Sequence, residues 1–172
     1  GKAIYGIDKP MIAAVNGVAA GAGFSLALCC DMRVGSENAG FVTVFSERNL
    51  PPEGGMSYLL PRIVGMGRAM DLILTRRRID AEEAYRLGLL DRLVPPADLM
   101  PTARDMAARI CELPPGAVRI TKRSIRRAMD TDFSASTEYE TQAGRFTAQT
   151  PKDAEESRVA FYEKRKPKFI GR

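Results

Sequence analysis

The sequence predicts an α/β fold, because a short buried-strand pattern, a turn of small residues and a series of helical patterns follow one another along the chain. The strand pattern is the apolar run at residues 11–15 (MIAAV), with turn-forming residues on both sides. The turn is residues 17–24 (GVAAGAGF), in which nothing is larger than valine before the final phenylalanine. Amphipathic helical patterns, separated by Pro and Gly, fill the C-terminal half.

The run at residues 11–15 suits a strand covered on both faces better than an amphipathic helix. The small-residue turn after it lets the backbone approach a ligand or adopt conformations that only glycine tolerates. A buried helix then begins at Ala22 or Gly23, and its first N–H groups would stabilise an oxygen that gains negative charge above the turn. The alternative is that these small residues only allow close packing of the helix against the sheet, and a Gly-rich turn alone does not decide between the two.

The next strand leads to residues 51–55 (PPEGG), which bring one carboxylate, Glu53, onto the same scaffold. Glu53 is either a catalytic group or an acid in the first turn of a helix that starts after Pro52, where its charge would interact favourably with the helix dipole. Further along the chain, the patterns predict a helix over residues 81–89 with Asp80 as N-cap and a short strand at residues 91–94.

Two amphipathic helices are predicted over residues 99–111 and 117–129, with a Pro-Pro-Gly breaker between them. We therefore expect a core over residues 1–115 and a helical region over residues 116–172. The second helix carries a basic stripe on one face, which is compatible with nucleic-acid phosphates, with other phosphates or with a solvated surface. No aromatic residues interleave with the stripe, so nucleic acid is not the expected partner. The stripe consists of Arg119, Lys122, Arg123, Arg126 and Arg127.

Four stretches identify the chain as resembling the enoyl-CoA hydratase/isomerase (crotonase) superfamily over nearly its whole length. They are KPMIAAVNGVAAGAGFSLALCCDMRVGSENAGF, PPEGGMSYLLPRIVGMGRAMDLILT and IDAEEAYRLGLLDRLVPP, followed by VAFYEKRKPKFIGR near the C-terminus. The resemblance implies a spiral ββα core with a C-terminal helical region for trimerisation, and a homotrimer or hexamer. It also implies an acyl-CoA thioester as substrate, an oxyanion hole for the thioester carbonyl, and no separate cofactor.

The two catalytic glutamates of the family's hydratases match Ser25 and Phe45 in this chain. Neither side chain is an acid or base near neutral pH, so the resemblance does not carry hydratase activity with it. Some isomerases of the superfamily hold a single carboxylate at the position that matches Glu53. The resemblance therefore implies an isomerase, with Glu53 as the base and the Ala22 N–H in the oxyanion hole. It further implies that Gly21, Gly23, Ser25 and Phe45 line the substrate pocket.

Other functions remain open at this point. The dehalogenases that act on chlorobenzoyl-CoA have a nucleophilic aspartate at the position of Glu53, and a family member that binds acyl-CoA without catalysis would also lack both hydratase glutamates. By the same resemblance, Phe161 and Lys164 match residues that contact the adenine and phosphate end of CoA. The alternative for this segment is a solvated basic tail.

With 172 residues, of which 45% are hydrophobic, the chain is long enough to bury one core. It contains no apolar stretch that could span a bilayer, no histidine for metal sites or triads, and three cysteines without metal-ligand spacing. We therefore expect a cytoplasmic protein without a metal. Compared with the family, the chain lacks the N-terminal strands that supply the other oxyanion-hole N–H, so the isolated segment is expected to be poorly stable or inactive.

Overall fold

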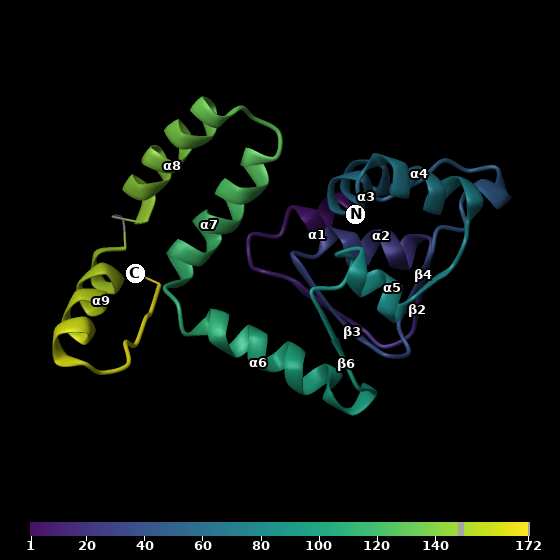
Figure 1. The fold of residues 1–172 in the computed structure, drawn as a ribbon. Helices are drawn as coiled ribbons and strands as arrows, with labels where there is room; N and C mark the ends of the chain where they lie inside the picture. The colour runs from purple at the N-terminus through teal and green to yellow at the C-terminus, as the bar shows by residue number, and fades with distance from the viewer. Residues whose placement is uncertain (148–149, 172) are drawn as a thin grey trace. The chain divides into compact units, whose positions relative to one another are not determined.

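The computed structural model describes residues 1–147 and 150–171, which form two compact units (Figure 1). Unit 1 consists of residues 1–7 and 11–105, and unit 2 consists of residues 8–10 together with the chain from residue 106 onward. The units divide within helix α6 (Leu99–Cys111), whereas the division expected after residue 115 lies at the start of α7 (Pro115–Ala128). No described helix is long and apolar enough to cross a membrane.

Unit 1 contains two three-stranded sheets that the chain builds in alternation. The first sheet is parallel and has the order β1 (Ile12–Val15), β3 (Met32–Ser36) and β6 (Arg92–Val94). The second has the order β2 (Val18–Ala20), β4 (Gly40–Val42) and β5 (Ile79–Asp80), and only its β4–β5 pair is antiparallel.

This alternation is a spiral of ββα turns. The chain places β1 in one sheet and β2 in the other, returns through helix α2 (Ala22–Cys29), and then lays β3 beside β1 and β4 beside β2. The strand predicted at residues 11–15 and the helix predicted from Ala22 are confirmed as β1 and α2. The spiral ββα core expected from the resemblance is thus present in unit 1.

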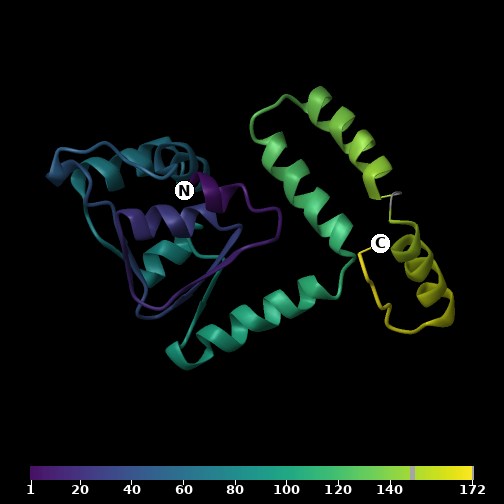
Figure 2. The same ribbon diagram turned by 180° about the vertical axis from the view of Figure 1, so that it is seen from behind.

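Helices cover the second half of the spiral. In both views, α3 (Met56–Val64) and α4 (Met66–Thr75) lie on the side of α2 that faces away from the strands (Figures 1 and 2). The predicted helix after Asp80 is α5, and the Asp80 Oδ1 accepts the Glu83 N–H at 2.8 Å as an N-cap should. The remaining helices of unit 1 are α1 (Lys2–Tyr5), α3 (Met56–Val64), α4 (Met66–Thr75) and α5 (Ala81–Arg86), with short 3₁₀ turns η1 (Ser46–Arg48) and η2 (Pro96–Asp98).

The core of unit 1 is apolar and places α2 at its centre. The rings of Phe24 and Phe41 meet with their centroids 4.8 Å apart, and both side chains are fully buried. Met56 and Leu60 on α3 belong to the same cluster. A helix held on two sides by such packing presents its first turn in a fixed position.

Unit 2 contains the end of α6 and helices α7, α8 (Phe133–Thr147) and α9 (Pro151–Glu163), with residues 8–10 packed against α7. The Lys122 ammonium donates to the carbonyl of Lys9 at 2.8 Å, and the Arg123 guanidinium pairs with the Asp8 carboxylate. Lys122 is buried, which was not expected from its place in the basic stripe. Part of that stripe therefore holds unit 2 together.

Candidate active site

The turn before α2 requires glycine at position 21. Gly21 is buried with a φ of 48° and a ψ of −111°, and its N–H donates to the Val42 carbonyl at 2.9 Å. A Cβ at this position would lie 2.9 Å from the Val44 Cγ2. Conformation and space therefore both exclude a side chain, and the tight turn aims the start of α2 outward.

The first N–H groups of α2 are accessible. Ala22 and Gly23 are both exposed, and among the described residues their N–H groups donate to no backbone carbonyl. Such unsatisfied donors at the positive end of a helix dipole can hold an oxygen that develops negative charge. Ala22 and Gly23 therefore present accessible N–H groups at the start of α2.

Ser25 has different surroundings from those expected of a substrate-pocket residue. Its side chain is only 2% exposed. Its hydroxyl lies 2.7 Å from the Glu53 carbonyl oxygen, to which it donates, and 3.3 Å from the Gly21 carbonyl oxygen. The hydroxyl therefore joins the first turn of α2 to the backbone of residue 53 instead of facing solvent.

Glu53 lies on a loop before α3 and not within the helix. Gly54 and Gly55 follow it with φ values of 68° and 94°, and α3 begins only at Met56. The interpretation of Glu53 as an acid in the first helical turn is therefore wrong, because two left-handed glycines separate it from the helix. The Glu53 side chain is exposed, and within residues 1–147 and 150–171 no hydrogen bond or ion pair engages its carboxylate.

Phe45 packs against the turn at Gly21 from the interior side. Its side chain is 6% exposed, and its ring atom Cζ lies 3.8 Å from the point that a Cβ of Gly21 would occupy. Phe45 thus packs against Gly21 and supports the turn from the interior. One contiguous arrangement therefore lies at the start of α2. It consists of Gly21, Ser25, Phe45 and the Glu53 backbone, together with the exposed Ala22 and Gly23.

An open groove of about 350 Å³ lies beside this arrangement. Its walls come from β1, β2 and the outer face of α2, and they are small or apolar, as with Ala13, Val18 and Leu26. Gly23 lines the groove, whereas Ala22 and Glu53 do not. In the described part of the chain, no three metal-ligating side chains gather closely enough to hold an ion.

The two residues matched to CoA contacts lie on unit 2, at the end of α9. Phe161 is 80% exposed, with its ring edge-on to that of Tyr162 at a centroid distance of 5.9 Å. Lys164 is the C-cap of α9, has a φ of 55° and is exposed. An accessible aromatic ring and an ammonium group are therefore available at the same helix end.

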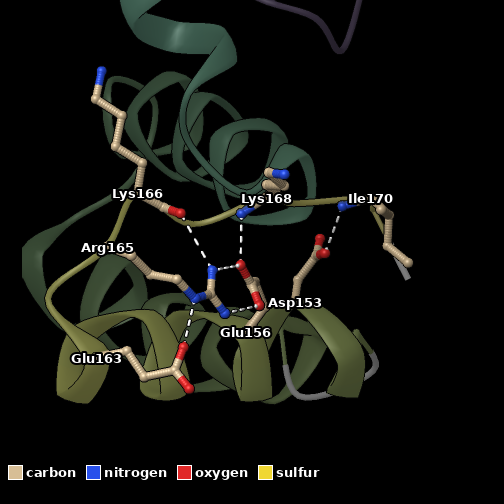
Figure 3. Close-up of polar contacts among 7 residues, drawn as sticks. All are labelled: Asp153, Glu156, Glu163, Arg165, Lys166, Lys168 and Ile170. Carbon is tan, nitrogen blue, oxygen red and sulfur yellow. Dashed lines mark hydrogen bonds and ion pairs between the residues drawn. The ribbon is translucent and has the colours of Figure 1, made fainter.

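The segment after Lys164 folds back along α9 through a set of polar contacts (Figure 3). The Arg165 guanidinium donates two hydrogen bonds to the Glu156 carboxylate, at 2.6 and 2.8 Å, and the Lys168 N–H donates a third at 2.7 Å. The two oxygens of Asp153, a buried carboxylate, accept the N–H groups of Ile170 and Gly171, each at 2.8 Å. We call residues 165–171 the C-terminal strap.

These contacts lower the pKa of Glu156 from 4.5 to about 2, mainly through the hydrogen bond from Arg165 and then through the Lys168 N–H. Residues 165–171 are thus held by carboxylates of α9, while residues 165–168 remain exposed to solvent. Both the strap and the contact between Ser25 and Glu53 join residues far apart in the sequence. For the second contact, the polar side chain of Ser25 in a helix predicted to be buried was a local signal.

Comparisons with known proteins agree with the fold and the motif order. The family profile of enoyl-CoA hydratase/isomerase matches residues 2–172. A short-chain-enoyl-CoA hydratase of Clostridium acetobutylicum is 41% identical over 162 residues, which are 93% of this chain and 61% of that protein. A 1,2-epoxyphenylacetyl-CoA isomerase of Escherichia coli is 37% identical over 170 residues, which are 96% of this chain and 63% of that protein.

Among solved structures, an enoyl-CoA hydratase from Bacillus anthracis matches with a TM-score of 0.95 and 37% identity, over 99% of this chain and 66% of that chain. The protein therefore belongs to the enoyl-CoA hydratase/isomerase family and has the crotonase fold. The chain spans less than two thirds of the length of the two curated relatives.

Proposed function

We propose that this protein acts on an acyl-CoA thioester and shifts a carbon–carbon double bond from the 3-enoyl to the conjugated 2-enoyl position. Glu53 is the single acid–base group, and the Ala22 N–H holds the thioester oxygen. The observation that supports this most is the hydrogen bond at 2.7 Å from Ser25 to the Glu53 backbone. It fixes the loop carrying the exposed carboxylate to the same helical turn that presents the free N–H groups.

The chemistry requires one base and one oxyanion donor. The Glu53 carboxylate removes a proton from C2 of the substrate, and the electrons of that C–H bond pass into the C1–C2 bond and onto the thioester oxygen. The Ala22 N–H stabilises the resulting dienolate. The protonated Glu53 then returns the proton to C4, the C2–C3 double bond forms and the carbonyl is restored. Because the proton leaves and returns through the same group, one carboxylate suffices.

Two further points favour isomerisation over the addition of water. Ser25 and Phe45, at the positions of the hydratase carboxylates, are 2% and 6% exposed and are engaged with the backbone and with Gly21. At these two positions neither side chain supplies a second acid or base. The similar protein from Escherichia coli is named an isomerase of a CoA thioester, so isomerase chemistry is represented among the relatives.

For the remainder of the substrate, we propose that the exposed ring of Phe161 and the ammonium of Lys164 contact the adenine and phosphates of CoA. A homotrimer or hexamer is the assembly in which we expect the site to work. Neither proposal is needed for the proton transfers, which depend on Glu53 and the first turn of α2.

The ultraviolet absorbance of the conjugated thioester provides the test. A 3-enoyl-CoA is mixed with the full-length gene product, which serves as the parent, or with its variant Glu53→Gln, and thioester binding is measured separately by calorimetry. We expect the parent to produce the 2-enoyl absorbance and the variant to be slower by about 10²–10⁴-fold with similar affinity, since only the proton-transfer group is lost.

Glu47→Gln is the matched control, because Glu47 is an exposed acid in the preceding segment whose carboxylate pairs with Arg76. It should keep the parent rate. Failure of a folded, thioester-binding parent to form the conjugated product would overturn the proposal, and loss of absorbance from a 2-enoyl-CoA would reveal hydration instead. Halide release from a chlorobenzoyl-CoA would favour dehalogenation.

A further inference from the structure

One face of α2 donates hydrogen bonds to the loop that carries Glu53. Ser25 and Cys29 lie one helical turn apart, and their side chains reach two consecutive carbonyls of that loop. The Ser25 hydroxyl lies 2.7 Å from the Glu53 oxygen, and the Cys29 thiol lies 3.3 Å from the Gly54 oxygen. The loop is thereby attached to the helix at two successive peptide units.

Burial makes these contacts effective. Ser25 and Cys29 are 2% and 1% exposed, so water does not compete for their donors, and a hydrogen bond in such surroundings is electrostatically stronger than at the surface. The fit between helix and loop is also close. A Cβ on Gly54 would lie only 2.8 Å from the Ser25 Cβ, which shows that the loop backbone rests directly on Ser25.

The carboxylate of Glu53 depends on this backbone for its position. Its side chain is exposed and, in the described residues, has no polar partner of its own. Residues 51–53 have no regular secondary structure, and among the residues that the structure describes the Glu53 carbonyl otherwise accepts only the Met56 N–H, at 3.3 Å. The position of the Glu53 backbone, from which the carboxylate extends, is therefore set by its contact with Ser25 together with the neighbouring contact of Cys29 with Gly54.

We propose that Ser25 is a positioning residue, whose hydroxyl fixes the Glu53 carboxylate relative to the N–H groups at the start of α2. This inference rests on the proposed role of Glu53 as the base. In this proposal Ser25, which is 2% exposed, acts without contacting the substrate itself. It acts by joining base and oxyanion donor into one rigid arrangement, and a displacement of about 1 Å between such groups can lower a rate about 10²-fold.

The first variant is Ser25→Ala, measured in the absorbance assay. We expect kcat to fall by at least about tenfold while KM changes less than about twofold, because the base moves but the thioester-binding groups remain. The matched control is Thr43→Val, which removes another buried hydroxyl that donates to a backbone carbonyl, that of Leu72 at 3.1 Å. This control should lose similar stability and keep the parent kcat. An unchanged kcat in Ser25→Ala would overturn the proposal.

Ser25→Cys is the conservative variant. A thiol makes the neighbouring contact at 3.3 Å, so Ser25→Cys should retain the attachment at a longer distance and show a kcat between those of the parent and Ser25→Ala. If Ser25→Ala does not fold, the kcat of Ser25→Cys decides, and a value equal to the parent's contradicts the proposal.

The double variant Ser25→Ala/Glu53→Gln distinguishes the positioning role of Ser25 from the catalytic role of Glu53. If Ser25 acts through Glu53, adding Ser25→Ala to Glu53→Gln should cause no further loss of kcat. A fully active Glu53→Gln would refute the proposed function, whatever the result at Ser25. An inactive Glu53→Gln with a fully active Ser25→Ala would refute only the positioning role.

Discussion

At the scale of single residues, Gly54 shows how closely loop and helix share space. Its φ of 68° lies in the left-handed region, and a Cβ would come within 2.8 Å of the Ser25 Cβ. We expect Gly54→Ala to lower the free energy of unfolding by about 1–2 kcal/mol from the backbone conformation alone, with the steric conflict adding to that loss. Urea unfolding followed by far-ultraviolet circular dichroism measures the change.

Gly67→Ala is the control for this prediction. Gly67 lies in α4, has no neighbouring atom within 4 Å of a Cβ, and does not have a left-handed φ. An alanine there should stabilise the protein by about 0.5–1 kcal/mol, because glycine loses more conformational freedom in a helix. Equal effects of the two substitutions would show that the loop moves away from Ser25 without cost.

Some individual residues could be predicted from the sequence and others could not. Asp80 was predicted as an N-cap because a cap depends on residues within one turn, and the structure confirms it. The contact of Ser25 with Glu53 joins positions 28 residues apart, and no local pattern encodes it. The helix-start interpretation of Glu53 failed because Gly54 and Gly55 adopt left-handed conformations that delay α3.

At the scale of elements, the C-terminal strap is held to α9 by buried and exposed carboxylates. Asp153→Asn keeps the shape of the side chain but replaces one of the two acceptors for Ile170 and Gly171 with a donor. We expect the strap to open more often and trypsin to cut faster after Lys168. Glu155→Gln, the same kind of change on an exposed residue of α9, should leave the cleavage rate unchanged.

The attachment of the strap also depends on pH. The pKa of Glu156 is lowered from 4.5 to about 2, so the folded state binds the proton less tightly than the unfolded chain. The contribution of this contact is therefore complete above about pH 4.5 and is lost as the pH falls toward 2. The amide proton of Lys168 should report this change by nuclear magnetic resonance, and Glu156→Gln should abolish it. Titration centred near pH 4.5 would contradict the assignment.

At the scale of the whole molecule, the net charge of +5 does not imply a nucleic-acid surface. Arg123 pairs with Asp8, Lys122 donates to the Lys9 carbonyl, and the Arg127 guanidinium lies 4.8 Å from the centre of the Tyr139 ring. With these cations engaged within unit 2, we expect no electrophoretic mobility shift of a short RNA or duplex DNA at physiological salt. A shift that weakens steeply with added salt would contradict this expectation.

The spiral core was predicted from the resemblance of the chain's motifs to the crotonase superfamily, whereas local patterns by themselves predicted the strand at residues 11–15 and the helix from Ala22. The boundary between the two units was harder to predict from the sequence. It lies inside α6, whose helical pattern continues without a break, whereas Pro114, Pro115 and Gly116 give the strongest boundary signal nearby. A compact unit is defined by packing between distant segments, such as residues 8–10 with α7, and the sequence does not display that packing.

The contact between Ser25 and Gly54 also limits which substitutions this protein can accept during evolution. A Cβ on Gly54 would lie 2.8 Å from the Ser25 Cβ, so a larger side chain at either position requires the backbone at the other to move away. A glutamate at position 25, as in a site with two carboxylates, would displace the loop that carries Glu53 before a second acid at position 45 could become useful. Directed evolution of hydration from this chain would therefore have to alter helix and loop together, because each single step would lose the old activity without gaining the new one.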